Sequence, residues 1–413
     1  MSSLGALTHS LDVILRFGAA MLRSGDTAFR VRDAMGLLAK TLGIEQLAVH
    51  ITVGGITATA RAGGETVTLA REMAPLGVDA SRIAALERLA RTSKPGLTPE
   101  TLAAEIDAIE ATPALHSLPL IALSMAVASA CFSYLNGGDL LATGAAAVGG
   151  GLGQTARTLL SRKGFNQYAM TALCAVLASG VYCLIVLGFG VRSFALAHAV
   201  GFISSVLFLV PGFPLVAALL DLVQHQTLAG ITRLAYGTML LLAAAFGLCI
   251  VAGIAGLTTI TPPPLQLGEL ATLLLRAIAS FAGGCGFAIL YNSSARTVLA
   301  VGGLALVGNE LRLALHDAGM ALEPATFVGA LTVGLLASLA RRRLREPRIA
   351  LTVPGIIIMV PGTYAFETVV LFEQGAVLAA MQAAVLGAFV VGAMALGLAA
   401  ARFISECGWI VES

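Results

Sequence analysis

Two apolar segments of the chain have the residue pattern of a broken membrane helix. VLFLVPGFPLVAALLD contains Pro211 and Gly212, and IIIMVPGTYAFETVVLF contains Pro361 and Gly362. Proline removes an amide donor and clashes with the preceding turn, and glycine permits the bend. Freed backbone groups are tolerated at membrane depth only beside protein or a water-filled cavity, and an exposed helix N-terminus attracts a carboxylate. The pattern therefore predicts noncovalent binding of a small polar solute.

Each break is followed by an acid. Asp221 comes ten residues after Pro211, and Glu367 comes six residues after Pro361. An acid near the membrane centre costs about 2.5–3.5 kcal/mol on insertion scales, so its presence requires a reason. One hypothesis is that the two acids bind a cationic group or carry protons. The other is that both lie at membrane ends in contact with water, because the flanking DLVQHQ and FEQG are partly polar.

Further polar residues extend this candidate site. Asn309 and Glu310 correspond to Gln154 and Thr155 in a repeat described below, and they could add polar walls. The cysteines form no C-x-x-C pair and lack histidines at zinc spacing, so we predict neither a metal nor a cofactor. No catalytic spacing such as H-E-x-x-H or G-x-S-x-G occurs, so we do not expect an enzyme.

The composition places these residues in a membrane protein. The chain is 57% hydrophobic and only 12% charged, with a mean hydropathy of +0.89. Residues 1–114 hold 23 of the 48 charged residues, which predicts a small soluble domain followed by a long membrane domain. The net charge of +2 gives no broad field for binding nucleic acid. Ten apolar segments have spanning length: 115–135, 139–159, 167–188, 193–211, 231–256, 267–290, 296–313, 324–340, 350–371 and 375–402.

Basic residues set the expected orientation. With the N-terminus inside, eleven lysines and arginines lie at cytosolic ends of the segments and two at outer ends, and RRRLREPR gives the strongest signal. Both termini should therefore be cytosolic. At the start of the second segment, Asp139 is predicted to cap the helix.

The ten segments form two sets of five, within residues 115–260 and 261–413. Matching pairs are Asn136 with Asn292, Arg157 with Arg312, and Pro211 with Pro361, at offsets of 156, 155 and 150. Landmarks in the same order at similar offsets indicate an internal repeat. An odd number of spans per repeat forces opposite orientations, so we expect the inverted repeat typical of secondary transporters.

Residues 1–114 predict a small α/β domain. Helical spacing runs from Leu11 to Leu22, and a second helix covers residues 27–42 and closes at Gly43. QLAVHITVGGITATARAGGETVTLARE then alternates as strands do, with Gly63-Gly64 as a hairpin turn. Two more helices should begin near Asp79 and at Thr98-Pro99. A gating or regulatory role fits this domain better than chemistry.

With these motifs in place, the chain resembles the bacterial threonine/serine exporter family. The matching runs are LRFGAAMLRSGDTAFRVRDAM, LVPGFPLVAALLD and VPGIIIMVPG, and the order of parts covers nearly the whole chain. The resemblance implies a fused form of that family: a ten-span inner-membrane protein that exports threonine and serine by using the proton gradient. Two-protein relatives are connected with succinate export, so a dicarboxylate is the alternative substrate.

The expected partners are threonine, serine, protons and the lipid bilayer. A zwitterion needs one partner for its carboxylate, supplied by amides at a broken helix, and one for its ammonium, supplied by Asp221 or Glu367. A channel or sensor gated by the soluble domain and a structural assembly factor are competing hypotheses. A homo-oligomer is a further possibility that the sequence leaves open.

Overall fold

A computed structural model of the chain describes residues 3–73, 76–191, 196–255, 268–361, 364, 367–368, 371–372 and 374–406. The chain is mainly helical and divides into two units. The N-terminal unit comprises residues 1–115, 213–236 and 291–293, and the membrane unit comprises residues 116–212, 237–290 and 294–413.

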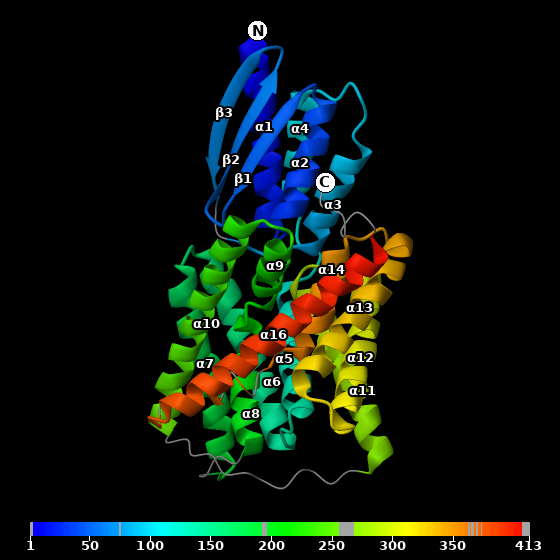
Figure 1. The fold of residues 1–413 in the computed structure, drawn as a ribbon. Coiled ribbons are helices and arrows are strands. Elements are labelled where there is room, and N and C mark those ends of the chain that lie inside the picture. The colour runs from blue at the N-terminus through cyan, green and yellow to red at the C-terminus, as the bar shows by residue number, and fades with distance from the viewer. Residues whose placement is uncertain are drawn as a thin grey trace. The chain divides into compact units, whose positions relative to one another are not determined.

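The N-terminal unit contains the predicted α/β domain (Figure 1). Its elements are α1 Ser3–Arg23, α2 Ala28–Thr41, β1 Gln46–Ile51, β2 Gly55–Ala62, β3 Glu65–Glu72, α3 Ala80–Thr92 and α4 Pro99–Ala111. The strands form an antiparallel sheet in the order β1-β2-β3. α1 packs on β2 and β3, α2 packs on β1, and the core between them includes Leu11, Ile14, Phe17 and Ile56.

Local sequence signals explain these boundaries. Gly63 and Gly64 have φ values of +57° and +81°, which is the two-residue turn that favours glycine in a β-hairpin. The Asp79 side chain accepts a hydrogen bond from the Arg82 amide at 3.0 Å, and Thr98 accepts one from the Thr101 amide at 3.3 Å. The predicted helix starts and hairpin are therefore confirmed.

Two segments from far along the chain complete the N-terminal unit. One comprises α9, Gly212–Val223, from Phe213 onward and the first turns of α10, Thr227–Ala255. The other is the short stretch around Asn292, whose side chain donates to Asp79 at 2.9 Å and accepts from the Leu115 amide at 2.7 Å. Residues 1–115 therefore fold against pieces of the apolar half of the sequence.

The membrane unit consists of helices (Figure 1). In addition to the rest of α10, its elements are α5 Leu118–Leu135, α6 Leu140–Arg162, α7 Gln167–Gly188, α8 Leu196–Ser204, η1 Leu207–Leu209, α11 Glu269–Leu290, α12 Ala295–Asp317, α13 Leu322–Leu344, α14 Arg348–Ile356, η2 Ile357–Met359 and α16 Val377–Ser405. The predicted cap of α6 is confirmed, because Asp139 accepts from the Ala142 amide at 2.7 Å.

The helices of the two halves pack in the same order. α5, α6 and α7 pack in succession and all contact α8; α11, α12 and α13 do the same around α14. The 3-10 turn η1 contacts α5 and α6, and η2 contacts α11 and α12.

Within the described residues, seven helices are long and apolar enough to span a membrane, or eight if the bent pair around η1 is one span. This is fewer than the ten that the sequence predicts. α6 has 23 residues but is glycine-rich and carries Gln154 and Arg157, so it is not among the candidate spans. The apolar helix Arg348–Met359 is too short, because it ends at the second break.

Candidate functional site

The two predicted breaks lie in the membrane unit and have the same local structure. α8 leads through η1 to Pro211, after which α9 begins at Gly212, and α14 leads through η2 to Pro361. Each 3-10 turn closes with an i→i+3 bond, from the Val210 amide to Leu207 and from the Val360 amide to Ile357. This tightening is expected ahead of a proline, because proline cannot donate to the next turn. Gly362 lies outside the described residues.

The two breaks contact each other. A Cβ placed on Gly212 would lie 3.2 Å from Cγ1 of Ile357, the first residue of η2. In both halves, a glycine of a neighbouring helix leaves room for a side chain of the 3-10 turn. A Cβ on Gly153 of α6 would lie 2.5 Å from Phe208 of η1, and one on Gly308 of α12 would lie 2.8 Å from Met359 of η2. Segments 150 residues apart are thus packed together at the breaks.

Polar side chains of α11, α12 and α13 form a network beside the second break. Asn309 is buried and donates from Nδ2 to Oγ of the buried Ser280 at 2.9 Å. Arg312 donates from Nη1 to Asn309 Oδ1 at 3.1 Å and from Nε to Thr326 Oγ1 at 3.0 Å. Glu310, half-buried, accepts from Ser280 at 3.3 Å. The side chains of Asn309 and Glu310 therefore both form hydrogen bonds with Ser280.

The first half has a smaller polar group at the equivalent position of α6. Arg157 donates from Nη1 to the carbonyl of Phe208 at 2.7 Å, which satisfies a backbone acceptor of η1. Gln154 is buried and donates to Thr158 at 3.2 Å. Sequence reasoning used Arg157 and Arg312 as landmarks of the repeat and as charges that set the orientation, without including them among the predicted site residues. The signal that could have identified them is the shared spacing of a buried amide and an arginine three residues later.

Asp221 belongs to the N-terminal unit. Its side chain is fully buried, and Oδ1 accepts from the amides of Ala28 at 2.8 Å and Phe29 at 3.4 Å. These are the first amides of α2, where a helix favours negative charge. The buried Arg233 lies 3.8 Å from Asp221 Oδ2 and donates to the Asp26 carbonyl at 2.8 Å.

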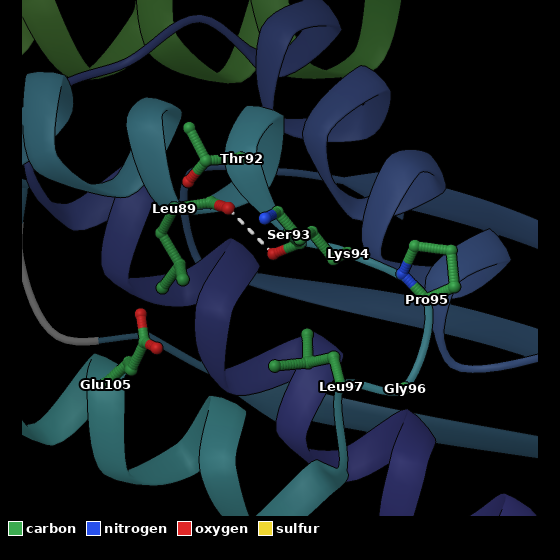
Figure 2. A pocket seen from close by; sticks show the side chains of 8 residues that line it. All are labelled: Leu89, Thr92, Ser93, Lys94, Pro95, Gly96, Leu97 and Glu105. Carbon is green, nitrogen blue, oxygen red and sulfur yellow. Dashed lines mark hydrogen bonds between the residues drawn. The ribbon is translucent and has the colours of Figure 1, made fainter.

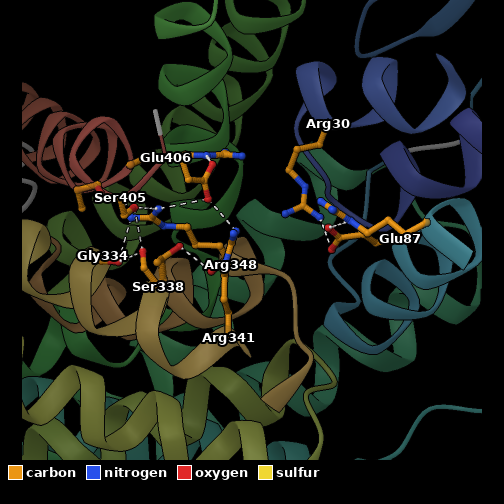
Figure 3. Close-up of polar contacts among 12 residues, drawn as sticks. Arg30, Glu87, Gly334, Ser338, Arg341, Arg348, Ser405 and Glu406 are labelled. Carbon is orange, nitrogen blue, oxygen red and sulfur yellow. Dashed lines mark hydrogen bonds and ion pairs between the residues drawn. The ribbon is translucent and has the colours of Figure 1, made fainter. Parts of the chain in front are cut away.

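A buried ion-pair network continues from Asp26 into α3 (Figure 3). Arg30 bonds Asp26 at 2.9 Å and Glu87 at 2.8 Å, and Arg91 bonds Glu87 at 2.9 Å. Burial raises the pKa of Asp26 above its ordinary value, and the positive charge of Arg30 opposes this only in part. Burial also acts to raise the pKa of Glu87, but Arg30 and Arg91 outweigh it, so that pKa lies below its ordinary value.

The remaining predicted acid, Glu367, has an exposed side chain. It follows the second break in helical conformation. The structure thus gives Asp221 and Glu367 different surroundings, although the sequence treats them as equivalents. Their roles in binding or proton transfer stay a prediction.

Two arginines of the run RRRLREPR, Arg341 and Arg348, form ion pairs where the ends of α13, α14 and α16 meet in the membrane unit (Figure 3). Glu406 pairs with Arg341 at 2.7 Å, with Arg402 at 2.8 Å and with Arg348 at 3.7 Å. Arg348 also donates to Ser405 Oγ at 2.8 Å and to the Gly334 carbonyl at 2.9 Å. Because Glu406 pairs with Arg341 and Arg348, these two arginines of the run join the ends of α13, α14 and α16.

A shallow pocket of the N-terminal unit contains none of the predicted site residues (Figure 2). Its lining consists of Leu89, Thr92, Ser93, Lys94, Pro95, Gly96, Leu97 and Glu105. Ser93 there donates to the carbonyl of Leu89 at 2.7 Å, which closes the end of α3. In the part of the chain that the structure describes, no three His, Cys, Asp or Glu side chains group to hold a metal ion. The polar groups at the two breaks are therefore the strongest candidate site, and they can bind a solute by hydrogen bonds and charge.

Two family models match the chain. One, described as a putative threonine/serine exporter, covers residues 12–255, and the other, described as a threonine/serine exporter, covers residues 276–404. No solved structure matches.

Curated relatives extend over most of the chain. A probable threonine/serine exporter of Mycobacterium tuberculosis is 27% identical over 88% of this chain and 70% of its own length. A threonine/serine exporter of Corynebacterium glutamicum is 24% identical over 85% of this chain and 73% of its own. A probable succinate transporter subunit of Escherichia coli, YjjP, is 23% identical over 59% of this chain and 93% of its own.

Proposed function

Because the chain belongs to the threonine/serine exporter family, with both of the family's domains in one polypeptide, we propose that it is a secondary transporter that exports threonine and serine. The transporter lies in the bacterial inner membrane with both termini in the cytosol, and the proton gradient drives export. Its membrane domain is an inverted repeat of five plus five helices. Residues 1–114 act as a cytosolic gating or regulatory domain.

The observation that carries this proposal is the contact between the two breaks. Secondary transporters with inverted repeats bind solutes where discontinuous helices of the two halves meet. The 3.2 Å approach of a Gly212 Cβ position to Ile357 brings two such discontinuities together from segments 150 residues apart. Irregular backbone at membrane depth is tolerated where it lines a cavity or contacts protein, which fits a gated solute path.

The matched packing of the halves supports the repeat. α8 and α14 each contact three preceding helices in the same order, and each 3-10 turn packs on a glycine of the second of these helices. Gly153 and Gly308 are 155 residues apart, which is the offset between Arg157 and Arg312 in the repeat predicted from sequence. A two-state rocking of one half against the other would use such equivalent contacts.

A dicarboxylate is the second candidate substrate. The YjjP relative, named as a succinate transporter subunit, matches 59% of this chain and 93% of its own length. The two relatives named as threonine/serine exporters match the chain over both halves, which favours the amino acids. Both substrate classes share a carboxylate.

Three acids are candidates for proton coupling: Asp221, Glu310 and Glu367. Glu310 accepts from Ser280 in the network beside the second break, where protonation would change the bonding around Asn309. Asp221 already binds the first amides of α2 and faces Arg233. We therefore place Glu310 ahead of Asp221 as the proton-carrying group and assign Asp221 first to holding α2.

Flux measurements on purified protein in liposomes test the proposal. Labelled threonine, serine and succinate are followed in parallel under an imposed pH gradient. Gradient-driven movement of threonine or serine, each competed by the other, supports the amino-acid exporter. Movement of succinate alone replaces the substrate, downhill flux without coupling indicates a channel, and absence of any flux indicates a sensor or assembly factor.

A further inference from the structure

Each half of the membrane unit places one arginine beside its broken helix, three residues after a buried amide side chain. The two motifs are Gln154-Thr-Ala-Arg157 in α6 and Asn309-Glu-Leu-Arg312 in α12. We propose that Arg157 and Arg312 bind the carboxylate of the transported solute and that Gln154 accepts a hydrogen bond from its ammonium or hydroxyl group. This rests on the proposed transport function and names the groups that recognise the substrate.

Arg312 is held in a fixed orientation next to η2. Its Nε and Nη1 donate to Thr326 and Asn309 at 3.0 and 3.1 Å, both neutral acceptors. Its Cβ lies 3.2 Å from the position of a Cβ on Gly329, and the same position is 3.5 Å from the Met359 methyl group of η2. Neutral anchors leave the positive charge of the guanidinium uncompensated, and its planar fork suits a carboxylate.

Arg157 has the corresponding place next to η1. Its Nη1 donates to the Phe208 carbonyl at 2.7 Å, again a neutral acceptor. One turn earlier on α6, the Oε1 atom of Gln154 is buried and has no hydrogen-bond partner among the described residues. A buried acceptor without a donor costs free energy, and a solute N–H or O–H would remove that cost.

Among the buried and half-buried arginines of the membrane unit that the structure describes, these two differ from the others in having no counter-ion. Arg276 pairs with Asp317 at 2.6 Å, and Arg348 shares Glu406 with two neighbours. In the described part of the chain, neither Arg157 nor Arg312 has an acid within ion-pair distance, and both are half-buried. A charge at membrane depth without a partner is expensive, so the missing anion is most simply the carboxylate that the protein carries.

In the proposed inverted repeat, the two arginines would lie on opposite sides of the path. The breaks contact each other, so a solute at η1 and a solute at η2 share one region. Arg157 would hold the carboxylate when the path opens to one side, and Arg312 would hold it when the path opens to the other. A solute with one carboxylate and one hydrogen-bond donor satisfies an arginine and Gln154 together, as threonine and serine do.

The test compares charge-removing variants in the liposome assay. Arg312→Gln and Arg157→Gln should each raise the KM for threonine by about tenfold or more, since each removes a charge-assisted bond to the substrate. Arg312→Lys should recover part of the affinity because it retains the charge but not the fork. Arg296→Gln, at an exposed site on the same helix as Arg312, is the matched control and should transport as the unaltered protein does.

A second measurement needs no variant and therefore does not depend on folding. Threoninamide keeps the ammonium and hydroxyl of threonine but lacks the carboxylate, so it should fail to compete with labelled threonine. Effective competition by threoninamide, or an unchanged KM in both glutamine variants, would overturn the assignment. Failure of the proposed function gives a different result, namely no threonine or serine flux in the unaltered protein. If that protein moves succinate, the variants are measured on succinate with succinamide as the competitor.

Discussion

Asp221→Ala should lower the local stability of the first turn of α2. The buried carboxylate of Asp221 accepts hydrogen bonds from α2 amides and also lies beside the buried Arg233. Its Oδ1 accepts from two α2 amides at 2.8 and 3.4 Å, and Arg233 lies 3.8 Å from Oδ2. A hydrogen bond to a charged group contributes about 1.5–3 kcal/mol. Breaking a buried ion pair on one side costs about 3–5 kcal/mol. Arg233 keeps its bond to the Asp26 carbonyl, so we take the lower part of this range.

Hydrogen–deuterium exchange measures this effect at the amides concerned. A loss of about 3 kcal/mol from local stability speeds exchange of the Ala28 and Phe29 amides roughly 150-fold, since each 1.4 kcal/mol is a factor of ten. Peptides of β2, which supplies no partner to Asp221, should change much less. The full-length protein in nanodiscs is suitable, because the readout is local and does not require the whole chain to unfold.

Matched variants separate the contributions. Asp12→Ala removes an acid from an exposed ion pair with Arg71, which contributes about 1 kcal/mol or less, so exchange in α2 should stay near that of the unaltered protein. Adding Arg233→Met to Asp221→Ala removes the unpaired charge and should restore part of the protection. If Asp221→Ala leaves the Ala28 and Phe29 amides within threefold of their original protection, the reasoning about this contact is wrong.

Three further predictions concern packing, pH and transport. Gly308→Ala should lower the free energy of unfolding by about 1–3 kcal/mol, because the added Cβ would meet Val333 and Met359. Gly303→Ala on the same helix adds its Cβ to open space and should raise the free energy of unfolding by up to about 1 kcal/mol. Equal unfolding temperatures of the two variants in detergent would contradict this prediction. The pKa of Glu87 is lowered in the folded state, so its stabilising contribution is present above the unfolded value of about 4.3 and is lost as the pH falls through the lower folded value. The stability difference between the unaltered protein and Glu87→Gln should therefore shrink on acidification from pH 7, and a constant difference in chemical unfolding down to about pH 3 would argue against the ion-pair network. Pro361→Ala should impair transport by straightening the broken helix, and unchanged flux in liposomes would count against a site at the breaks.

The elements of residues 1–114 could be predicted because their signals are local. Thr98 followed by proline starts a helix, and Gly63-Gly64 makes a hairpin, whatever the rest of the chain does. The number of spans was harder to predict from apolar length alone. α6 is a helix of the membrane unit, yet its glycines lower its hydropathy. They also allow the close approach of Phe208, which would lie 2.5 Å from a Cβ placed on Gly153. Packing, rather than hydropathy, accounts for that sequence.

The site residues were predictable only in part, because their partners are distant in sequence. Pro211 and Pro361 identify the breaks through backbone chemistry, but nothing local indicates that Ile357 contacts Gly212. Arg157 and Arg312 look like ordinary helix-end cations in sequence. Their neutral partners become visible only when Thr326 and the Phe208 carbonyl are placed next to them.

Asp221 is the residue for which sequence and structure favour different roles, and Asp221→Asn distinguishes them. Asparagine keeps an oxygen acceptor for the Ala28 amide but cannot carry a proton or balance the charge of Arg233. If Asp221 carries the coupled proton, the variant should lose gradient-driven export while α2 keeps its exchange protection. If Asp221 serves to hold α2, protection and export should fall together, and a second variant that restores protection should restore export. The buried contact of Asp221 with the α2 amides, 193 residues away in sequence, favours the second result.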